Sequence, residues 1–245
     1  MQIGSFEFKP ALWPTIAALV IVPSFCGLGI WQLGRAADKQ ERLLAYAQSE
    51  QFGPANISLD QVFDATPGYR QVRLTGHYDG QHPFLLDNQI QEGRVGYHVF
   101  TPLLITDNRA ILVNRGWIPQ GGSRSELPAV ITPEGEVSMT GVLSPEPGYG
   151  MLLGKDIESD KIWPRVVQAI VLPRLQHELN DVELAPQVLL LDPNEAGGFV
   201  RIWKIVQFGP ERNRGYAFQW FSMAAAVLII FIVVNTRRRM RVTEE

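Results

Sequence analysis

Four histidines are the side chains of this sequence best suited to hold a metal ion or a haem iron: His77, His82, His98 and His177. No two of them stand at the spacing by which one face of a helix supplies a pair of metal ligands. His77 and His98 could face each other from adjacent strands, and such a pair would suit a metal or a haem. Isolated histidines are more often half-buried polar residues, and we favour that interpretation.

The common catalytic motifs are absent from the sequence. It contains no Gly-rich phosphate loop, no Ser nucleophile elbow and no HExxH zinc motif. The single cysteine, Cys26, lies within an apolar run, so the polar part of the chain has no disulfide and no thiolate metal site. We predict a protein without catalytic residues or a bound metal, and keep a membrane-tethered enzyme such as a hydrolase only as an alternative.

The segment NRGWIP, residues 114–119, combines a cation with an indole at the end of an apolar strand. Arg115 and Trp117 could bind a ligand carboxylate or a partner protein there. In the structural alternative, Gly116 forms a bulge, Trp117 fills the core and Asn114 caps a turn. The residue types favour the structural alternative, and Arg115 and Trp117 are kept as candidate partner-binding residues.

Two uncharged apolar segments lie near the two ends of the chain. We assign the C-terminal one as a transmembrane helix over residues 213–235, because no Asp, Glu, Lys or Arg occurs from Gly215 to Thr236. Such a run supplies the ~20 residues that cross a ~30 Å hydrocarbon core, where backbone groups must be satisfied within a helix. Tyr216 and Trp220 then lie at the level of the lipid headgroups, where aromatic rings are enriched.

The N-terminal segment predicts a second transmembrane helix over residues 11–33. Only uncharged residues lie between Lys9 and Arg35. Trp31 marks the outer interface, and Arg35 reaches lipid phosphate from there. A cleaved signal peptide is the alternative, but the run is longer than the ~7 to 15 residues of a signal core and lacks a cleavage site of small residues. We expect both helices to be retained as anchors.

Polar side chains inside these spans are costly to bury in lipid, so they indicate interactions. Gln32 in the first span and Gln219 in the second could form a hydrogen bond across the helix pair or toward a third helix. With the interfacial aromatic and basic side chains, they form the candidate partner surface of the anchor.

The charges that flank the spans predict the orientation of the chain. Four arginines follow the second span: Arg237, Arg238, Arg239 and Arg241. The positive-inside rule places such a tail in the cytoplasm. Both tails, residues 1–10 and 236–245, are then cytoplasmic, and residues 34–212 form a periplasmic domain of an inner-membrane protein. The net charge is −3 and the intervening domain is acidic, which argues against a nucleic acid as a partner.

The domain between the spans is predicted to be rich in β-strands. Residues 69–79 alternate apolar and polar side chains with a period of two. A short charged helix is expected at residues 37–52, and residues 165–180 have helical spacing interrupted by Pro173. We predict an α+β membrane protein in which two transmembrane helices flank an antiparallel, barrel- or sandwich-like domain with one or two short helices. The other expected strands cover residues 83–89, 96–106, 110–119, 136–143, 187–192 and 200–208.

Six blocks of sequence occur in order along nearly the whole chain: GLGIWQLGRAADK, YRQVRLTGHYD, LLDNQ, GYHVFTPL, ILVNRGWIP and GYAFQWF. Together they resemble the surfeit locus protein 1 family of cytochrome c oxidase assembly factors. The resemblance implies a two-span membrane protein that assists haem a insertion into subunit I of a haem-copper oxidase, or stabilises that subunit. Its implied partners are subunit I, the lipid bilayer and an enzyme of haem a synthesis. Its implied cofactor is transient haem a, and a direct haem a carrier is the alternative function.

One position departs from that pattern. In bacterial members that resemble this chain, haem a binding is associated with a histidine three residues before the tyrosine of the last block, and that position here is Asn213. Because an amide is a poor iron ligand compared with an imidazole, the haem-ligand role is not carried over to Asn213. Either another residue holds haem, with His77, His82 and His98 as candidates, or the chain assists assembly through protein contacts alone.

Overall fold

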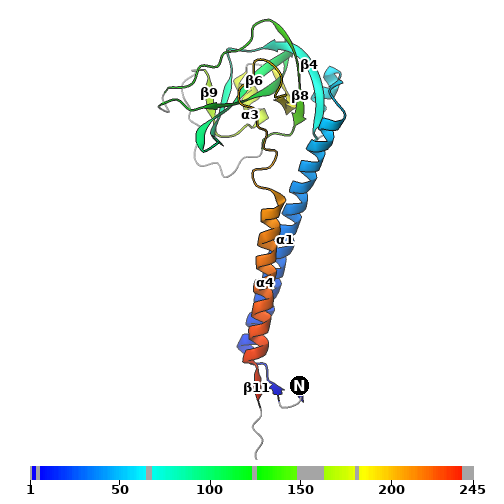
Figure 1. Ribbon diagram of the computed structural model, residues 1–245, viewed down its shortest axis with the longest axis vertical. Helices are drawn as coiled ribbons and strands as arrows, with labels where there is room; N and C mark the ends of the chain where they lie inside the picture. Colours follow the sequence, from blue (N-terminus) through cyan, green and yellow to red (C-terminus); the bar gives the residue numbers. More distant parts are fainter. Residues whose placement is uncertain are drawn as a thin grey trace, which may run out of the picture. The chain divides into compact units, whose positions relative to one another are not determined.

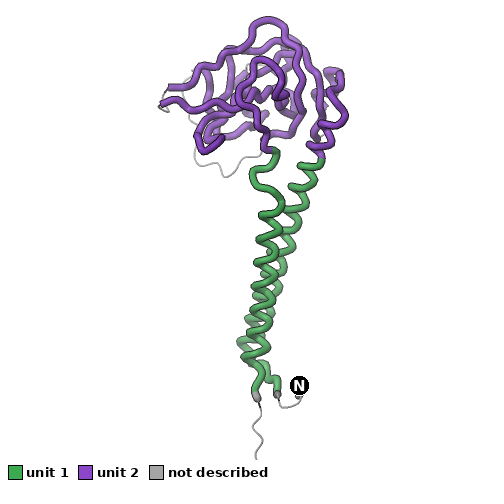
Figure 2. The backbone as a smooth tube through the Cα atoms, in the orientation of Figure 1, with its two compact units in different colours: residues 1–44, 205–245 green, residues 45–204 purple. Residues whose placement is uncertain are grey.

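The computed structural model describes residues 2–3, 6–64, 68–122, 126–147, 163–179 and 182–238. The chain divides into two compact units, which Figure 2 shows in different colours. Residues 1–44 and 205–245 form one of them, here called the helical unit, and residues 45–204 form the other, the β unit. The two ends of the chain therefore belong to one unit and its middle to the other.

Two long helices make up most of the helical unit: α1 (Leu12–Gln51) and α4 (Pro210–Val234). Each contains an 18-residue window that is long and apolar enough to cross a membrane, with mean hydropathies of 1.9 and 2.3. Only 11% of each window is buried within the protein. Helices of this hydropathy are covered by protein or by lipid, so their exposure fits a membrane protein.

Helix α1 extends well past the apolar run. The charged helix expected at residues 37–52 is the continuous C-terminal part of α1. Neither Pro nor Gly occurs between Gly34 and Gly53, and strong helix formers such as Ala, Leu, Gln and Glu dominate this stretch. The helix ends shortly before Gly53, whose φ of 65° suits a residue without a side chain.

Helices α1 and α4 lie side by side and pack along a seam (Figure 1). Phe25 packs against Trp220 with 5.5 Å between the ring centroids. Gly29 lies against Phe221, so closely that a Cβ atom would stand 2.7 Å from the ring. The buried and half-buried seam residues include Phe25, Gly29, Gln32, Ala36 and Lys39 on α1, and Asn213, Ala217, Trp220, Ala224, Val227 and Phe231 on α4. Alternating steps of three and four residues give the 3.5-residue period of a left-handed coiled coil.

A small sheet joins the two ends of the helical unit. Its strands, in the order β1-β2-β11, are β1 (Gln2–Ile3), β2 (Phe6–Phe8) and β11 (Thr236–Arg238). Strand β2 precedes α1 and β11 follows α4, and the two strands pair antiparallel with Thr236 opposite Phe8. The helices are therefore antiparallel, as two successive spans require. Two arginines of the predicted basic tail lie in β11, whereas Arg239 and Arg241 lie outside the described residues.

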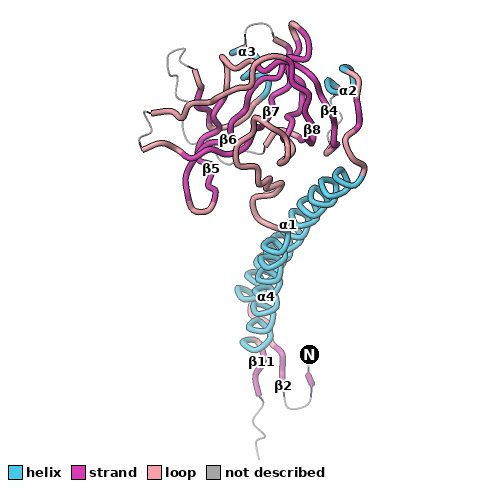
Figure 3. The backbone as a smooth tube through the Cα atoms, turned by 45° about the horizontal axis from the view of Figure 1, so that its top comes forward, coloured by secondary structure: helices cyan, strands magenta, loops and turns pink. Residues whose placement is uncertain are grey.

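The sheet of the β unit closes on itself. Its strand order is β3-β4-β8-β10-β7-β6-β5-β9, and an additional pairing of β4 with β6 joins β4, β8, β10, β7 and β6 into a ring. The prediction of a β-rich, barrel-like domain is confirmed (Figure 3). The strands are β3 (Ala55–Asn56), β4 (Arg70–Tyr78), β5 (Phe84–Gln91), β6 (Arg94–Thr106), β7 (Arg109–Pro119), β8 (Glu136–Ser144), β9 (Arg165–Val167) and β10 (Glu183–Leu191).

The sheet is mixed rather than wholly antiparallel. Strands β7 and β10, β3 and β4, and β5 and β9 pair in parallel. The members of each pair are separated along the chain by at least one other element, which gives the chain room for the crossover that parallel strands need. Two short helices accompany the sheet. Helix α3 (Leu172–Glu178) lies in the segment expected to be helical, whereas α2 (Leu59–Phe63), which starts with a capping box at Ser58, was not expected.

Two segments differ from the expected secondary structure. Residues 165–180, expected to be helical, begin with strand β9, and Pro173 then lies in the first turn of α3, where proline is tolerated. Residues 200–208, expected to be a strand, form only an isolated bridge between Val200 and Trp117. Past Val200 the Trp203 indole donates a hydrogen bond to the Leu191 carbonyl at 3.2 Å, and this contact directs the chain away from β7.

Aliphatic side chains fill the ring of strands. The buried residues of this core are Val62, Val72, Leu74, Leu103, Ile111, Val113, Met139, Leu143, Ala185, Leu189 and Leu191. A second, smaller cluster consists of Leu85, Tyr97, Val99 and Ile118. The apolar side chains of the period-two pattern thus face these two cores, and their burial stabilises the β unit.

Candidate functional site

Hydrogen bonds between polar side chains join the two long helices. The Asn213 Nδ2 atom donates to Gln32 Oε1 at 2.6 Å, and the Lys39 ammonium donates to Asn213 Oδ1 at 2.7 Å. Gln32 and Lys39 stand seven residues apart on α1, which places both on the seam-facing side, and Asn213 lies in the first turn of α4. The oxygen and the nitrogen of the Asn213 amide are therefore both hydrogen-bonded. We call these three residues the amide bridge.

A second asparagine holds the opposite end of the helix pair. Asn235 is 3% exposed and follows the last turn of α4. Its Oδ1 atom accepts from the Ala11 N–H at 2.7 Å, and its Nδ2 atom donates to the Phe231 carbonyl at 2.7 Å. Twenty-two residues separate Asn213 from Asn235, about 33 Å along a helix, which matches a ~30 Å hydrocarbon core. Polar contacts thus close the pair at both ends of its apolar stretch.

Most of the predicted interfacial side chains lie within one helical turn of the amide bridge along the chain. Trp31, next to Gln32, is 57% exposed, and Arg35 is exposed as well. Tyr216 is exposed, and its hydroxyl accepts a hydrogen bond from Arg212 at 3.4 Å. Trp220 instead packs into the seam against Phe25. Trp31, Arg35 and Tyr216 are therefore the interfacial groups available to lipid or to a partner.

The expected pairing of Gln32 with Gln219 across the helix pair is wrong. Gln32 bonds to Asn213, and the Gln219 side chain is exposed. The seam uses positions 217 and 220 of α4, so position 219 points away from α1. Gln219 stays a candidate only for a contact outside the helix pair.

Arg115 and Trp117 lie inside the β unit, so the expectation that they face a partner is corrected. Arg115 is 1% exposed. Its guanidinium donates to the Ile131 carbonyl at 2.7 Å and to the Gly197 carbonyl at 2.5 and 2.8 Å. Trp117 is 6% exposed, and its indole donates to the Gln89 carbonyl at 2.8 Å. A buried cation must be hydrogen-bonded, so the structural alternative describes both side chains.

Two aromatic rings complete the surroundings of the buried guanidinium. The ring centroids of Tyr78 and Phe199 each lie 5.1 Å from the Arg115 Cζ atom, within the range of cation–π attraction. No carboxylate of a described residue forms an ion pair with Arg115, and burial lowers the pKa of its guanidinium. The same burial raises the pKa of Tyr78 to about 12. Carbonyl oxygens and rings therefore take the place of a counter-ion.

The structure separates the candidate histidines. His77 is exposed on β4 opposite Leu104, whereas His98 on β6 lies opposite Leu86 and Trp117. The alternative in which His77 and His98 face each other does not hold, because β4 meets β6 only at the end of β6 remote from His98. The favoured interpretation, in which they are separate polar residues, describes both. Among the described residues, no cluster of three or more His, Cys, Asp or Glu side chains could hold a metal ion.

His82 has the surroundings of an oriented imidazole. Its Nδ1 atom lies 2.6 Å from Asp79 Oδ2, and its ring meets the edge of Trp163 with centroids 4.7 Å apart. When the Asp79 carboxylate accepts from Nδ1–H, the Nε2 atom keeps its lone pair. That is the form in which an imidazole binds a metal, and a carboxylate in this place fixes the tautomer and the orientation of the ring.

His98 is half-buried and lies against Asn114. Its Nδ1 atom is 3.1 Å from Asn114 Nδ2 and 3.3 Å from Asn114 Oδ1. The Asn114 Oδ1 atom also accepts from the Gly116 N–H at 3.1 Å. Burial, and to a smaller extent Lys204, lowers the pKa of His98, although the Asn114 hydrogen bond raises it. This imidazole is neutral near pH 7.

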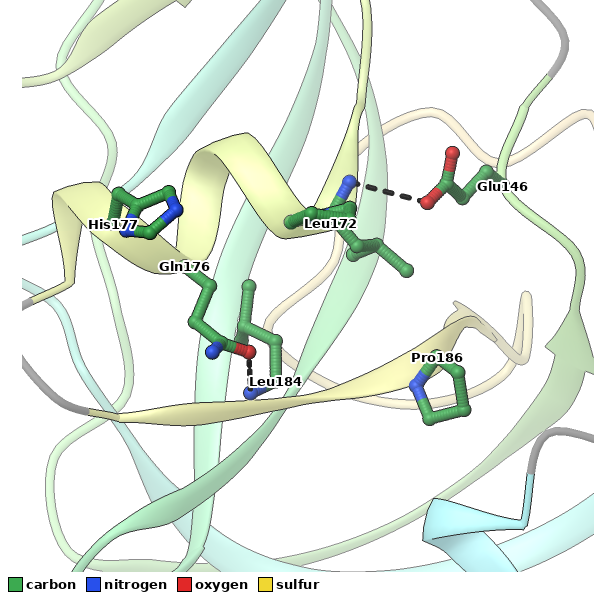
Figure 4. Close-up of a pocket in the computed structure, with 7 residues that line it drawn as sticks. Glu146, Leu172, Gln176, His177, Leu184 and Pro186 are labelled. Carbon is green, nitrogen blue, oxygen red and sulfur yellow. Dashed lines mark hydrogen bonds between the residues drawn. The ribbon is translucent and has the colours of Figure 1, made fainter.

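A pocket of about 300 Å³ lies beside α3 (Figure 4). The Glu146 carboxylate accepts from the Leu172 N–H at 3.1 Å, and Gln176 Oε1 accepts from the Leu184 N–H at 3.0 Å. His177, also part of the lining, is exposed. The two polar contacts serve backbone groups of the fold, so the pocket has no set of converging polar atoms for a ligand.

The position at which the resemblance implies a haem ligand does not fit one. The amide of Asn213 is a poor donor to iron, and its oxygen and nitrogen are both engaged in the amide bridge. The segments of the helical unit, residues 1–44 and 205–245, contain no histidine. The residues present here therefore do not supply an imidazole to haem.

Sequence reasoning missed Lys39 and Asn235 as contributors to the helix pair. Lys39 carried a signal, because it continues the 3.5-residue repeat from Gln32 and Ala36. Asn235 carried a weaker one, because it is the single amide at the far end of an apolar run. The 3.5-residue repeat identifies Lys39 only once it is known that the two spans pack against each other.

The chain is similar to known proteins over most of its length. The model of the SURF1 family matches residues 19–225. A SURF1-like protein of Rickettsia felis is 25% identical over 227 residues, which cover 89% of this chain and 95% of that protein. Surfeit locus protein 1 of Takifugu rubripes is 28% identical over 142 residues, 51% of this chain and 59% of that protein. An uncharacterized SURF1-like protein of Mycobacterium tuberculosis is 26% identical over 249 residues, 97% of this chain and 89% of that protein.

Proposed function

Since this chain belongs to the SURF1 family, generally known as a family of cytochrome oxidase assembly factors, we propose that it assists haem a insertion into subunit I of a haem-copper oxidase or stabilises that subunit. The family is not a recognised enzyme family. The proposed place of action is the inner membrane. One observation supports the proposal above all: the helix pair is closed by polar contacts at both ends and exposes its apolar sides.

The exposed sides of the pair fit contact with lipid and with other membrane helices. Leu19 is 70% exposed on α1, and Ile230 is 59% exposed on α4. In water such surface would be buried, whereas in a bilayer a neighbouring helix gains packing and interhelical hydrogen bonds from it. We infer that the pair docks beside the helices of subunit I while that subunit is incomplete.

The orientation follows from the charges next to the spans. Thr236, Arg237 and Arg238 pair with β2, so the chain enters α1 and leaves α4 at the same end of the pair. The positive-inside rule places that end in the cytoplasm. The β unit is then periplasmic, where it can contact the outer face of subunit I and an enzyme of haem a synthesis.

Deletion of the gene from its own host tests this proposal. We expect the haem a absorbance of the oxidase to fall while subunit I is still synthesised, and the full-length protein to restore it. A matched complementing variant, Ile131→Ser, changes an 82% exposed side chain of the β unit and should restore absorbance equally well. Unchanged oxidase spectra in the deletion strain would rule the function out.

A second candidate, transient haem a binding by the β unit, is favoured by His82 alone. Its Nδ1 atom faces the Asp79 carboxylate at 2.6 Å, which leaves Nε2 as the ligating atom. The full-length protein purified from haem a-producing cells should then show a Soret band that His82→Ala removes and the matched variant His77→Ala keeps. A colourless preparation would remove this candidate.

A further inference from the structure

The hydrogen-bonding needs of Gln32 and Lys39 select the residue type at position 213. The Lys39 ammonium can only donate, and Asn213 Oδ1 accepts a hydrogen bond from it at 2.7 Å. Gln32 Oε1 is an acceptor, and Asn213 Nδ2 donates a hydrogen bond to it at 2.6 Å. An asparagine offers one acceptor and one pair of donors, so it satisfies both neighbours. An imidazole bound to iron through one nitrogen keeps only an N–H donor, and Lys39 would then face a second donor with no acceptor between them.

Among the described side chains of the helical unit, the other residue types that bind haem iron are Cys26, Met223 and Tyr216. Cys26 lies about 9 Å along α1 from Gln32, and Met223 lies about 15 Å along α4 from Asn213, so neither joins the amide bridge in one site. Tyr216 is exposed and its hydroxyl accepts a hydrogen bond from Arg212 at 3.4 Å, so it takes no part in the amide bridge.

We propose that Asn213 is a helix-clamping residue that takes the place of a haem ligand, so that the helix pair of this chain holds no haem iron and acts as a pre-locked unit. The proposal rests on the proposed function for its setting in oxidase assembly. Asn235 closes the other end of the pair through the Ala11 N–H and the Phe231 carbonyl. A single polar residue on a seam fixes the register of a coiled coil, and two of them fix both ends. The two helices therefore present themselves to the partner subunit in a single register.

The clamp is tested on the full-length protein, purified in mild detergent from cells that make haem a. Far-UV circular dichroism on heating gives the thermal midpoint of the wild type, Asn213→Ala, Gln32→Ala and the double variant. We expect each single variant to lower the midpoint by about 2 to 5 °C. The double variant should lower it no further than Asn213→Ala does, because Gln32→Ala removes a hydrogen bond that Asn213→Ala has already removed. The control, Ser222→Ala, changes an exposed α4 residue and should leave the midpoint unchanged. Additive shifts, or none, would overturn the clamp.

The visible spectrum of the same preparations tests the absence of a haem ligand. We expect the Soret absorbance per protein to be equal in the wild type and Asn213→Ala. A Soret band that is present in the wild type and lost in Asn213→Ala would overturn the proposal. Asn213→Leu, which also removes the amide and adds no iron ligand, serves where Asn213→Ala does not yield folded protein, and the same outcomes apply. These readouts use the isolated protein, so a failure of the assembly function, seen as normal oxidase in the deletion strain, is a separate result.

Discussion

Arg115 donates two hydrogen bonds to the carbonyl oxygen of Gly197, from Nε at 2.8 Å and from a terminal nitrogen at 2.5 Å. The same guanidinium bonds to Ile131, so it joins β7 both to the loop that follows it and to the loop after β10. A charged donor contributes about 1.5 to 3 kcal/mol per bond, and a desolvated carbonyl that loses its donor costs about 1 to 3 kcal/mol. Arg115 is therefore a structural centre of the β unit.

Replacing this residue should destabilise the β unit. We expect Arg115→Leu to lower the free energy of unfolding by about 3 kcal/mol or more, because the carbonyl oxygens of Ile131 and Gly197 lose their donors. Urea denaturation of the full-length protein measures the change. The matched control Arg73→Lys alters an exposed arginine of β4 and should stay within about 0.5 kcal/mol of the wild type. Equal losses for both variants would contradict the structural role.

Hydropathy and periodicity are sufficient to predict the helices and most strands. Lipid accepts only segments with satisfied backbones, so the absence of charge between Lys9 and Arg35 already identifies the first span. Alternation works for β4, where Val72 and Leu74 face the core and Arg73 faces solvent. Both kinds of element can be predicted because each depends mainly on residues that are close together in the sequence.

The contacts between residues that are distant in the sequence could not be predicted from local patterns. The residue types of NRGWIP allow Arg115 to be a ligand-binding or a structural cation, and only the positions of Ile131 and Gly197 decide between them. Likewise Gln32 could bond to several polar residues of the second span, and the 3.5-residue seam selects Asn213. The parallel pairing of β7 with β10 depends on where the chain re-enters the sheet after α3, which no short pattern encodes.

Closure of the ring of strands depends on a glycine. A Cβ atom at Gly76 would overlap the Leu104 carbonyl oxygen, where β4 meets β6. We expect Gly76→Ala to lower the free energy of unfolding by about 1 to 3 kcal/mol, because the two strands must separate. Gly122→Ala is the control, since nothing lies within 4 Å of its added Cβ. If chemical denaturation gives the same midpoint for both variants, the closure does not need Gly76.

The half-buried His98 should make stability depend on pH. Because burial lowers its pKa below the ordinary 6.5, the unfolded chain takes up a proton at a higher pH than the folded chain does. This contribution to stability is fully present above about pH 6.5 and is lost as the pH falls through that value toward the folded pKa. We expect His98→Gln to flatten the dependence between pH 7.5 and 5, measured by urea denaturation. The exposed His77→Gln should keep it, and a slope that survives in His98→Gln would assign the effect to another group.

The orientation of the chain is open to a direct test. The basic C-terminal tail predicts that the loop at Gly121 lies outside and Lys9 inside. In a Cys26→Ser background, Gly121→Cys should react with a membrane-impermeant maleimide added to cells whose outer barrier is open. Lys9→Cys, which is also exposed, should react only after the inner membrane is permeabilised. The reverse pattern would place the β unit in the cytoplasm, remote from the outer face of subunit I, and the proposed site of action would then be wrong.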